Sequence, residues 1–161
     1  MIQRVQTIYM LASVIAVLTM HFFWLASFII PEGTFELNSL GLSSLNPEIK
    51  LDQMNWLLFG TLLVMLALPL VNIFLYNKRK VQLRVLIYAI VLNALYYGVF
   101  FWVCSQCKDT VAALSEAGAE VAVRYSYMML AMPALSIFCL VMAARGVIFD
   151  IALLKGLERL R

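Results

Sequence analysis

Charged side chains are absent from four long stretches of this chain. Residues 5–31, 53–77, 85–107 and 125–144 contain no Asp, Glu, Lys or Arg. An α-helix rises about 1.5 Å per residue, so about 20 apolar residues cross the ~30 Å hydrocarbon core of a bilayer. Only helices and closed barrels satisfy their backbone hydrogen bonds in lipid, and these stretches lack the alternation of strands. The pattern therefore predicts four transmembrane helices.

The predicted fold class is all-α, an antiparallel bundle of four transmembrane helices within a single domain that covers residues 1–161. The spans are expected at about residues 5–30, 54–76, 81–104 and 124–146. The short connection between the second and third spans makes these two helices antiparallel neighbours. Alternating residues at 34–37 and 48–51 favour a small β-hairpin or paired extended segments in the outer loop, and the Ala-rich residues 111–123 favour a short surface helix.

The C-terminal tail, residues 147–161, has a different pattern from the spans. Ile151, Leu154, Leu157 and Leu160 recur every three residues, and charged residues occupy other positions. This is typical of an amphipathic helix. Two arrangements remain open: the helix lies on the inner membrane surface, or it continues the fourth span into the cytoplasm. A docking face for another protein is a third interpretation.

The charges are divided between the two sides of the predicted membrane. One side holds only two acids, Asp150 and Glu158, and nine basic residues: Arg4, Lys78, Arg79, Lys80, Arg84, Arg145, Lys155, Arg159 and Arg161. The other side holds three basic residues and seven acids. Lys and Arg near span ends favour the cytoplasm, so both termini are predicted to be cytoplasmic. Because the charge is divided by side, a nucleic acid is not expected as a partner.

The basic residues on the cytoplasmic side are candidate contacts for lipid head groups or for another protein. The candidates are Arg4, Lys78, Arg79, Lys80, Arg84, Arg145, Arg159 and Arg161. Asp150 or Glu158 is also a candidate to pair with Arg4. The plainer interpretation is ordinary anchoring of the helix ends at the membrane interface.

The segment Cys104-Ser105-Gln106-Cys107 is the one motif with chemical content. On the outer side it meets an oxidising compartment, where disulfides persist. A thiol relay needs a second cysteine pair, but only Cys139, within the fourth span, remains. The predicted helix C-terminus also disfavours a thiolate. A redox pair, a structural disulfide and packing thiols therefore stay as alternatives for Cys104 and Cys107.

Other chemistry finds little support in the residues. His21 is the one histidine and lies within the first span, so neither a metal cluster nor a Ser/His/Asp triad is expected. Tyr96 and Tyr97 lie at about the same depth, and a tyrosine hydroxyl would satisfy a neutral His21. No span contains an acid, which argues against a proton-coupled exporter. No cofactor is predicted.

The two ends of the chain carry a family resemblance. The N-terminus reads Met1-Ile2-Gln3-Arg4-Val5-Gln6-Thr7, and the C-terminal part contains Ala144-Arg145-Gly146 and Glu158-Arg159-Leu160-Arg161. The chain thereby resembles a family of unknown function: small four-span bacterial inner-membrane proteins that begin Met-Ile-Gln-Arg-Ile-Gln-Thr and end in an Ala-Arg-Gly … Asp-Arg-Leu-Arg segment. Here Ile148-Phe149 replace expected basic residues, and Glu158 replaces an Asp. The resemblance implies a multi-pass protein of the bacterial inner membrane and supplies no activity.

Three functions follow as hypotheses. The leading hypothesis is a non-enzymatic accessory, assembly or scaffold component that contacts membrane lipids and another membrane protein, or itself as a homo-oligomer. The alternative is a membrane thiol-disulfide oxidoreductase that uses Cys104 and Cys107. A small transporter or lipid-binding protein is the third, and the absence of charge within the spans disfavours it.

Overall fold

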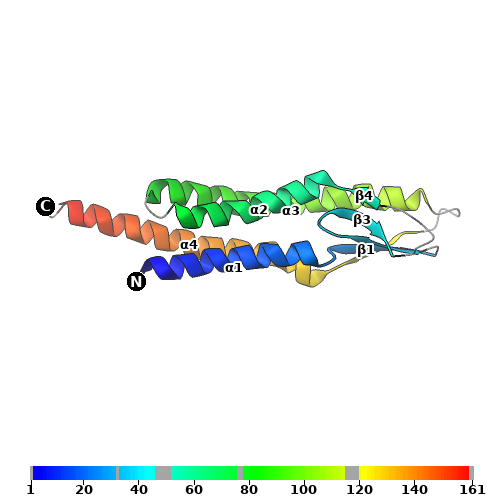
Figure 1. Ribbon diagram of the computed structural model, residues 1–161, viewed down its shortest axis with the longest axis horizontal. Helices are drawn as coiled ribbons and strands as arrows, with labels where there is room; N and C mark the ends of the chain where they lie inside the picture. Colours follow the sequence, from blue (N-terminus) through cyan, green and yellow to red (C-terminus); the bar gives the residue numbers. More distant parts are fainter. Residues whose placement is uncertain (1, 32, 46–51, 76–77, 115–119, 160–161) are drawn as a thin grey trace.

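A computed structural model describes residues 2–31, 33–45, 52–75, 78–114 and 120–159. The molecule is elongated, with a small sheet at one end of the helices and both termini at the other (Figure 1). We name these ends the sheet end and the termini end. The helices are α1 (Ile2–Phe22), α2 (Trp56–Phe74), α3 (Arg79–Ala112) and α4 (Tyr127–Arg159). The strands are β1 (Ala26–Ile30), β2 (Gly33–Leu37), β3 (Gly41–Ser44), β4 (Asp52–Met54) and β5 (Ala122–Tyr125).

The four helices among the described residues run alternately up and down the long axis (Figure 1). Helix α1 packs against α2 and α4, and α3 packs against the same two helices. All four are long and apolar enough to cross a membrane, as predicted. Large apolar side chains also cover the outside, and Ile8, Ile15 and Phe22 of α1 are each more than half exposed. An apolar exterior of this kind distinguishes the helical part from an ordinary water-facing surface.

Two helices are longer than predicted. Helix α3 continues past residue 104 to Ala112, and its 34 residues correspond to about 51 Å. Helix α4 runs without interruption from Tyr127 to Arg159 and includes Pro133. The tail therefore continues the fourth helix, which was one of the two predicted arrangements. In Figure 1, the last part of α4 extends past the start of α1 and past the start of α3.

The predicted first span, residues 5–30, is wrong beyond Phe22. Helix α1 ends there, and Ala26–Ile30 form strand β1. Ala26, Phe28 and Ile30 are buried, whereas Ile29 is 42% exposed. An unbroken apolar run of this length does not distinguish a helix from a buried strand, so the charge-free pattern hid the change.

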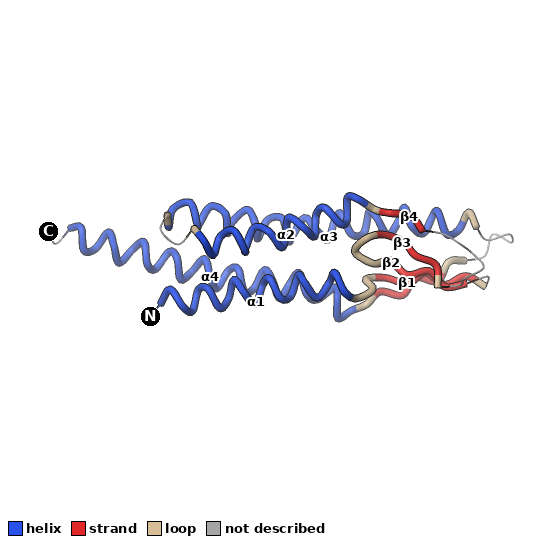
Figure 2. The backbone as a smooth tube through the Cα atoms, in the orientation of Figure 1, coloured by secondary structure: helices blue, strands red, loops and turns tan. Residues whose placement is uncertain are grey.

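The sheet is antiparallel and larger than the predicted hairpin, with the strand order β4-β3-β2-β1-β5 (Figure 2). Phe28 of β1 pairs with Phe35 of β2 on one side and with Val123 of β5 on the other. The buried face of the sheet forms a core with the second half of α3, which includes Val103 and Val111. The fold is therefore not purely α-helical, because a five-stranded sheet packs against the helices at one end.

The predictions for the segments between the helices were confirmed in one part and wrong in another. The alternation at residues 34–37 belongs to β2, as predicted, but its neighbours are β1 and β3. The predicted partner at residues 48–51 lies outside the described residues. The surface helix expected over residues 111–123 is wrong in its described part, since α3 ends at Ala112 and Ala122–Tyr125 form β5.

Candidate functional site

Three polar side chains from three helices meet in the interior at the termini end. Gln6 of α1 donates a hydrogen bond from Nε2 to Oδ2 of Asp150 of α4 over 3.0 Å. Arg79, the first residue of α3, places Nη1 2.8 Å from the same oxygen. The Asp150 side chain is 8% exposed and that of Arg79 is 25% exposed. The buried carboxylate therefore has an ionic partner and an amide donor, which offset the cost of removing its charge from water.

Gly146 of α4 makes room for this arrangement. A β-carbon at position 146 would lie 2.7 Å from Cγ and 3.0 Å from Nε2 of Gln6. Gln6 therefore crosses α4 over a position without a side chain and reaches Asp150, one turn further along. We name Gln6, Arg79, Gly146 and Asp150 the termini cluster.

All four helices contribute buried polar side chains near this end. Gln6 and Gln82 are each 5% exposed, Asp150 is buried as described above, and Asn72 is fully buried. Asn72 lies two residues before the end of α2, and neither atom of its amide has a hydrogen-bond partner among the described residues. Gln82 lies one turn after the start of α3. Apolar residues follow immediately toward the sheet end, where Met10, Leu86 and Val147 belong to one buried cluster.

The structure separates the predicted basic contacts into two groups. Arg79 belongs to the termini cluster, whereas the other described residues of the set are exposed: Lys78, Lys80, Arg84 and Arg145. The side chains of Arg4 and Arg159 and the whole of Arg161 lie outside the description. The ion pair of Asp150 is made with Arg79, and the predicted partner of Asp150 was Arg4.

No contact of Gln6 or Gly146 was predicted from the sequence. Both residues stand in the two terminal segments that carry the family resemblance, one in each. That resemblance was the available signal, because an isolated Gln and an isolated Gly in apolar helices give no other indication. The meeting of the two segments requires α1 and α4 to pack side by side, as they do.

The cysteine pair lies at the opposite end of the molecule. Cys104 and Cys107 are free thiols, 3% and 5% exposed, in the core between α3 and the sheet. Cys104 lies about two turns before the end of α3, and Cys107 lies more than one turn before it. The predicted placement at a helix C-terminus is therefore wrong. Cys139 of α4 is also free and buried. The redox and disulfide interpretations of Cys104 and Cys107 stay predictions.

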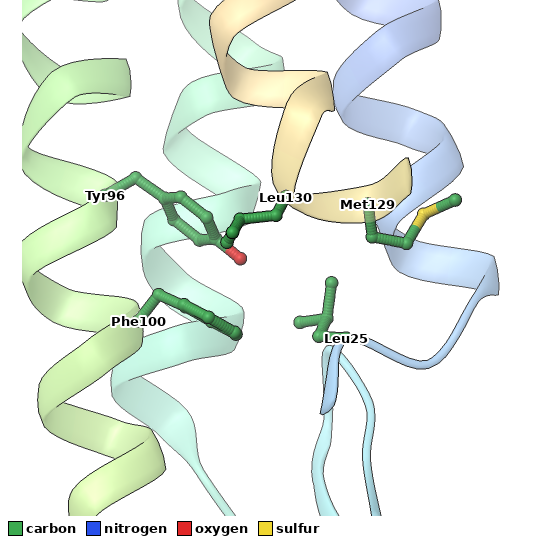
Figure 3. A pocket seen from close by; sticks show the side chains of 5 residues that line it. All are labelled: Leu25, Tyr96, Phe100, Met129 and Leu130. Atoms are coloured by element: carbon green, nitrogen blue, oxygen red, sulfur yellow. The ribbon is translucent and has the colours of Figure 1, made fainter. Parts of the chain in front are cut away.

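A small apolar pocket near the sheet end is lined by two aromatic rings of α3 and three aliphatic side chains (Figure 3): Leu25, Tyr96, Phe100, Met129 and Leu130. It has no room for a water molecule. The Tyr96 hydroxyl is buried and has no hydrogen-bond partner among the described residues. The neighbouring Tyr97 instead donates from its hydroxyl to the carbonyl oxygen of Leu130 over 2.9 Å.

His21 does not bond to either tyrosine, contrary to the arrangement considered from the sequence. Its Nδ1 lies 3.4 Å from the carbonyl oxygen of Val17 in its own helix, and its ring meets Phe59 edge-on at 6.2 Å. Both contacts are ordinary packing for a histidine near a helix end. Among the described residues there is no group of three or more metal-ligating side chains.

Almost the whole length of the chain matches one protein family. No curated protein matches it. A family model described as Domain of unknown function (DUF4293) matches residues 2–160 and so includes both segments that form the termini cluster. The chain belongs to this family, the domain of unknown function DUF4293.

Proposed function

We propose that this chain is an integral protein of the bacterial inner membrane, with four helices across the bilayer and both termini in the cytoplasm. Four helices of sufficient length and the apolar exterior support insertion. The orientation is supported by the exposed basic side chains at the termini end: Lys78, Lys80, Arg84 and Arg145. The termini end is then the cytoplasmic end, and the sheet lies outside the membrane.

Its role is that of a non-enzymatic accessory, assembly or scaffold component. The observation that carries this role is the end of α4, residues 151–159, which we name the α4 extension. Nine helical residues span about 13 Å, and the last part of α4 projects past the other helices (Figure 1). Leu153 and Leu154 are 48% and 47% exposed on it. An isolated helix of nine residues is marginal in water, so this one needs support from its base and a surface to cover its apolar side.

The termini cluster supplies the support. Asp150 precedes the extension directly and is bonded to α1 through Gln6 and to α3 through Arg79. These contacts fix the direction in which α4 leaves the other helices. A projecting helix with a fixed base suits recognition by the groove of another membrane protein, which reads exposed apolar anchors along one side.

The test is cross-linking in cells. A photoreactive residue is placed at Leu153, at Leu154 and, as a control on the sheet, at the 42% exposed Ile29. We expect positions 153 and 154 to capture the same membrane protein, confirmed by reciprocal purification, and position 29 to leave it uncaptured. A second copy of this chain as the captured protein would identify the same role in a homo-oligomer. Adducts with lipid alone would refute the role.

The thiol-disulfide alternative has weaker support. Cys104 and Cys107 are almost completely buried against the sheet, so a redox partner reaches them only if this core opens. Replacement of both cysteines by serine discriminates between the two functions. A loss of function together with a disulfide-exchange defect would favour the redox enzyme, whereas an unchanged phenotype would remove it. For a transporter, the Tyr96 pocket offers no passage, since water does not fit.

A further inference from the structure

The connection between α2 and α3 carries three consecutive basic side chains, Lys78, Arg79 and Lys80, which we name the basic turn. Lys78 and Lys80 are exposed, and a quarter of Arg79 is exposed. The first turn of α3 contains no acid, and the cap residue Lys78 makes no side-chain cap bond. Three cations therefore stand at the positive end of a helix, where the helix dipole favours anions. A bound anion offsets this unfavourable arrangement.

Arg79 differs from its two neighbours because its guanidinium is held in place. One of its five N–H donors, on Nη1, faces Oδ2 of Asp150, and Asp150 in turn is fixed by Gln6. Side-chain entropy opposes binding by long flexible cations, and an oriented guanidinium has already lost much of it. The rest of the planar fork is suited to a second, external anion with two oxygen acceptors.

Apolar side chains flank the basic turn on both sides. Phe74, the last residue of α2, is 80% exposed, and Val81 of α3 is 38% exposed. A site for a free anion such as inorganic phosphate gains nothing from exposed apolar neighbours. A lipid presents both chemistries together, with a phosphate at the level of the charges and acyl chains beside the apolar residues.

We propose that the basic turn binds the phosphate of an anionic phospholipid, with Arg79, oriented by Asp150, as the principal ligand and Lys78 and Lys80 beside it. The inference rests on the proposed insertion in the membrane, with the termini end in the head-group region. It goes beyond general attraction of positive charge to a membrane, because it assigns to Arg79 a role that another cation in the same place would not fill.

The test measures lipid retention by native mass spectrometry on full-length protein from nanodiscs of mixed phosphatidylglycerol and phosphatidylcholine. Arg79→Lys keeps the charge and removes the fork, and Arg84→Lys is the matched control at an exposed arginine of the same helix. We expect Arg79→Lys to weaken phosphatidylglycerol retention about fivefold and Arg84→Lys to leave it unchanged. Lys78→Gln with Lys80→Gln should weaken retention further, whereas Arg124→Gln on the sheet should have no effect.

Three results would overturn the inference: equal retention of the two lipids by the natural protein, equal losses in Arg79→Lys and Arg84→Lys, or displacement of the lipid by millimolar inorganic phosphate. Unchanged helicity and thermal unfolding of Arg79→Lys show that the variant is folded. Extraction of cell membranes with alkaline carbonate separates this inference from the proposed function. Protein that washes off refutes membrane insertion itself, and protein that stays but shows no lipid preference refutes the lipid site alone.

Discussion

Gln6 of α1 passes over Gly146 of α4 so closely that a β-carbon on Gly146 would approach Cγ of Gln6 to 2.7 Å. Glycine in the middle of a helix lowers stability relative to alanine by roughly 0.5–1 kcal/mol. At this position the missing side chain allows the Gln6–Asp150 hydrogen bond, which joins the first helix to the last. Gly146 therefore lowers the intrinsic stability of α4 but permits a hydrogen bond between α1 and α4.

Gly146→Ala is expected to destabilise the protein by about 1 kcal/mol, although alanine favours the helix. The β-carbon displaces Gln6 and leaves Asp150 with one partner fewer, and a hydrogen bond to a charged group contributes about 1.5–3 kcal/mol. The matched control is Gly156→Ala, since Gly156 of the same helix has no atom within 4 Å of an added β-carbon. The control should be neutral or stabilising. Thermal unfolding in detergent compares the two, and equal effects would contradict the role of Gly146.

The ion pair between Arg79 and Asp150 should show strong coupling. Asp150→Leu alone leaves a partly buried guanidinium without its carboxylate, and we expect a loss of about 1–3 kcal/mol, moderated by the exposed quarter of Arg79. Arg79→Met combined with Asp150→Leu removes both charges and should regain most of the loss. A double-mutant cycle of unfolding free energies measures the coupling. Additive effects of the two substitutions would show that the pair contributes nothing to stability.

The two adjacent tyrosines of α3 should differ in how the loss of the hydroxyl changes the stability of the protein. Tyr97→Phe removes the hydrogen bond to Leu130 and should lower stability by about 0.5–1.5 kcal/mol. Tyr96→Phe removes a buried hydroxyl without a partner, so it should be neutral or stabilising. Both substitutions leave the ring in place, which makes each the control for the other. A larger loss in Tyr96→Phe would show that its hydroxyl has a partner in the native protein.

The cysteines between α3 and the sheet should be protected from thiol reagents. In the native protein, we expect a maleimide to label Cys104 and Cys107 at least about tenfold more slowly than after unfolding, because labelling requires local opening. Ser105→Cys in a chain without the native cysteines provides the exposed reference on the same helix turn. Equal rates at the buried and exposed positions would show that the sheet does not cover α3 in solution.

The prediction from the charge-free stretches was most accurate for α2, whose ends lie close to the ends of the stretch at residues 53–77. Helix α2 begins at Trp56 after the cap residue Asn55, whose side chain accepts a hydrogen bond from the backbone N–H of Leu58. Charge alone did not locate the end of α1, because Ala26–Ile30 are as apolar as the helix before them. Strand β1 pairs with β2, which follows it directly, and also with β5, almost a hundred residues later, at Ala26↔Tyr125. The pairing with β5 joins residues so distant in sequence that neither segment alone indicates it.

The termini cluster illustrates the same limit at the level of single side chains. The sequence placed Asp150 among the basic residues at this end of the molecule, but the partner considered for it was Arg4, whereas the structure pairs it with Arg79. That choice depends on α3 beginning at Arg79, next to α4, and on Gly146 letting Gln6 pass. Both conditions concern how helices face each other. Periodicity along one helix does not contain this information.

The position of β5 at the edge of the sheet, next to β1, sets an order for assembly. Strands β1 to β4 leave the ribosome before α2, whereas β5 follows only after α3 is complete. Until then, the side of β1 away from β2 is an open edge, a template on which foreign strands pair and aggregate. A chain interrupted after Ala112 would keep that edge permanently, so the nascent protein is open to misassociation throughout the synthesis of α2 and α3.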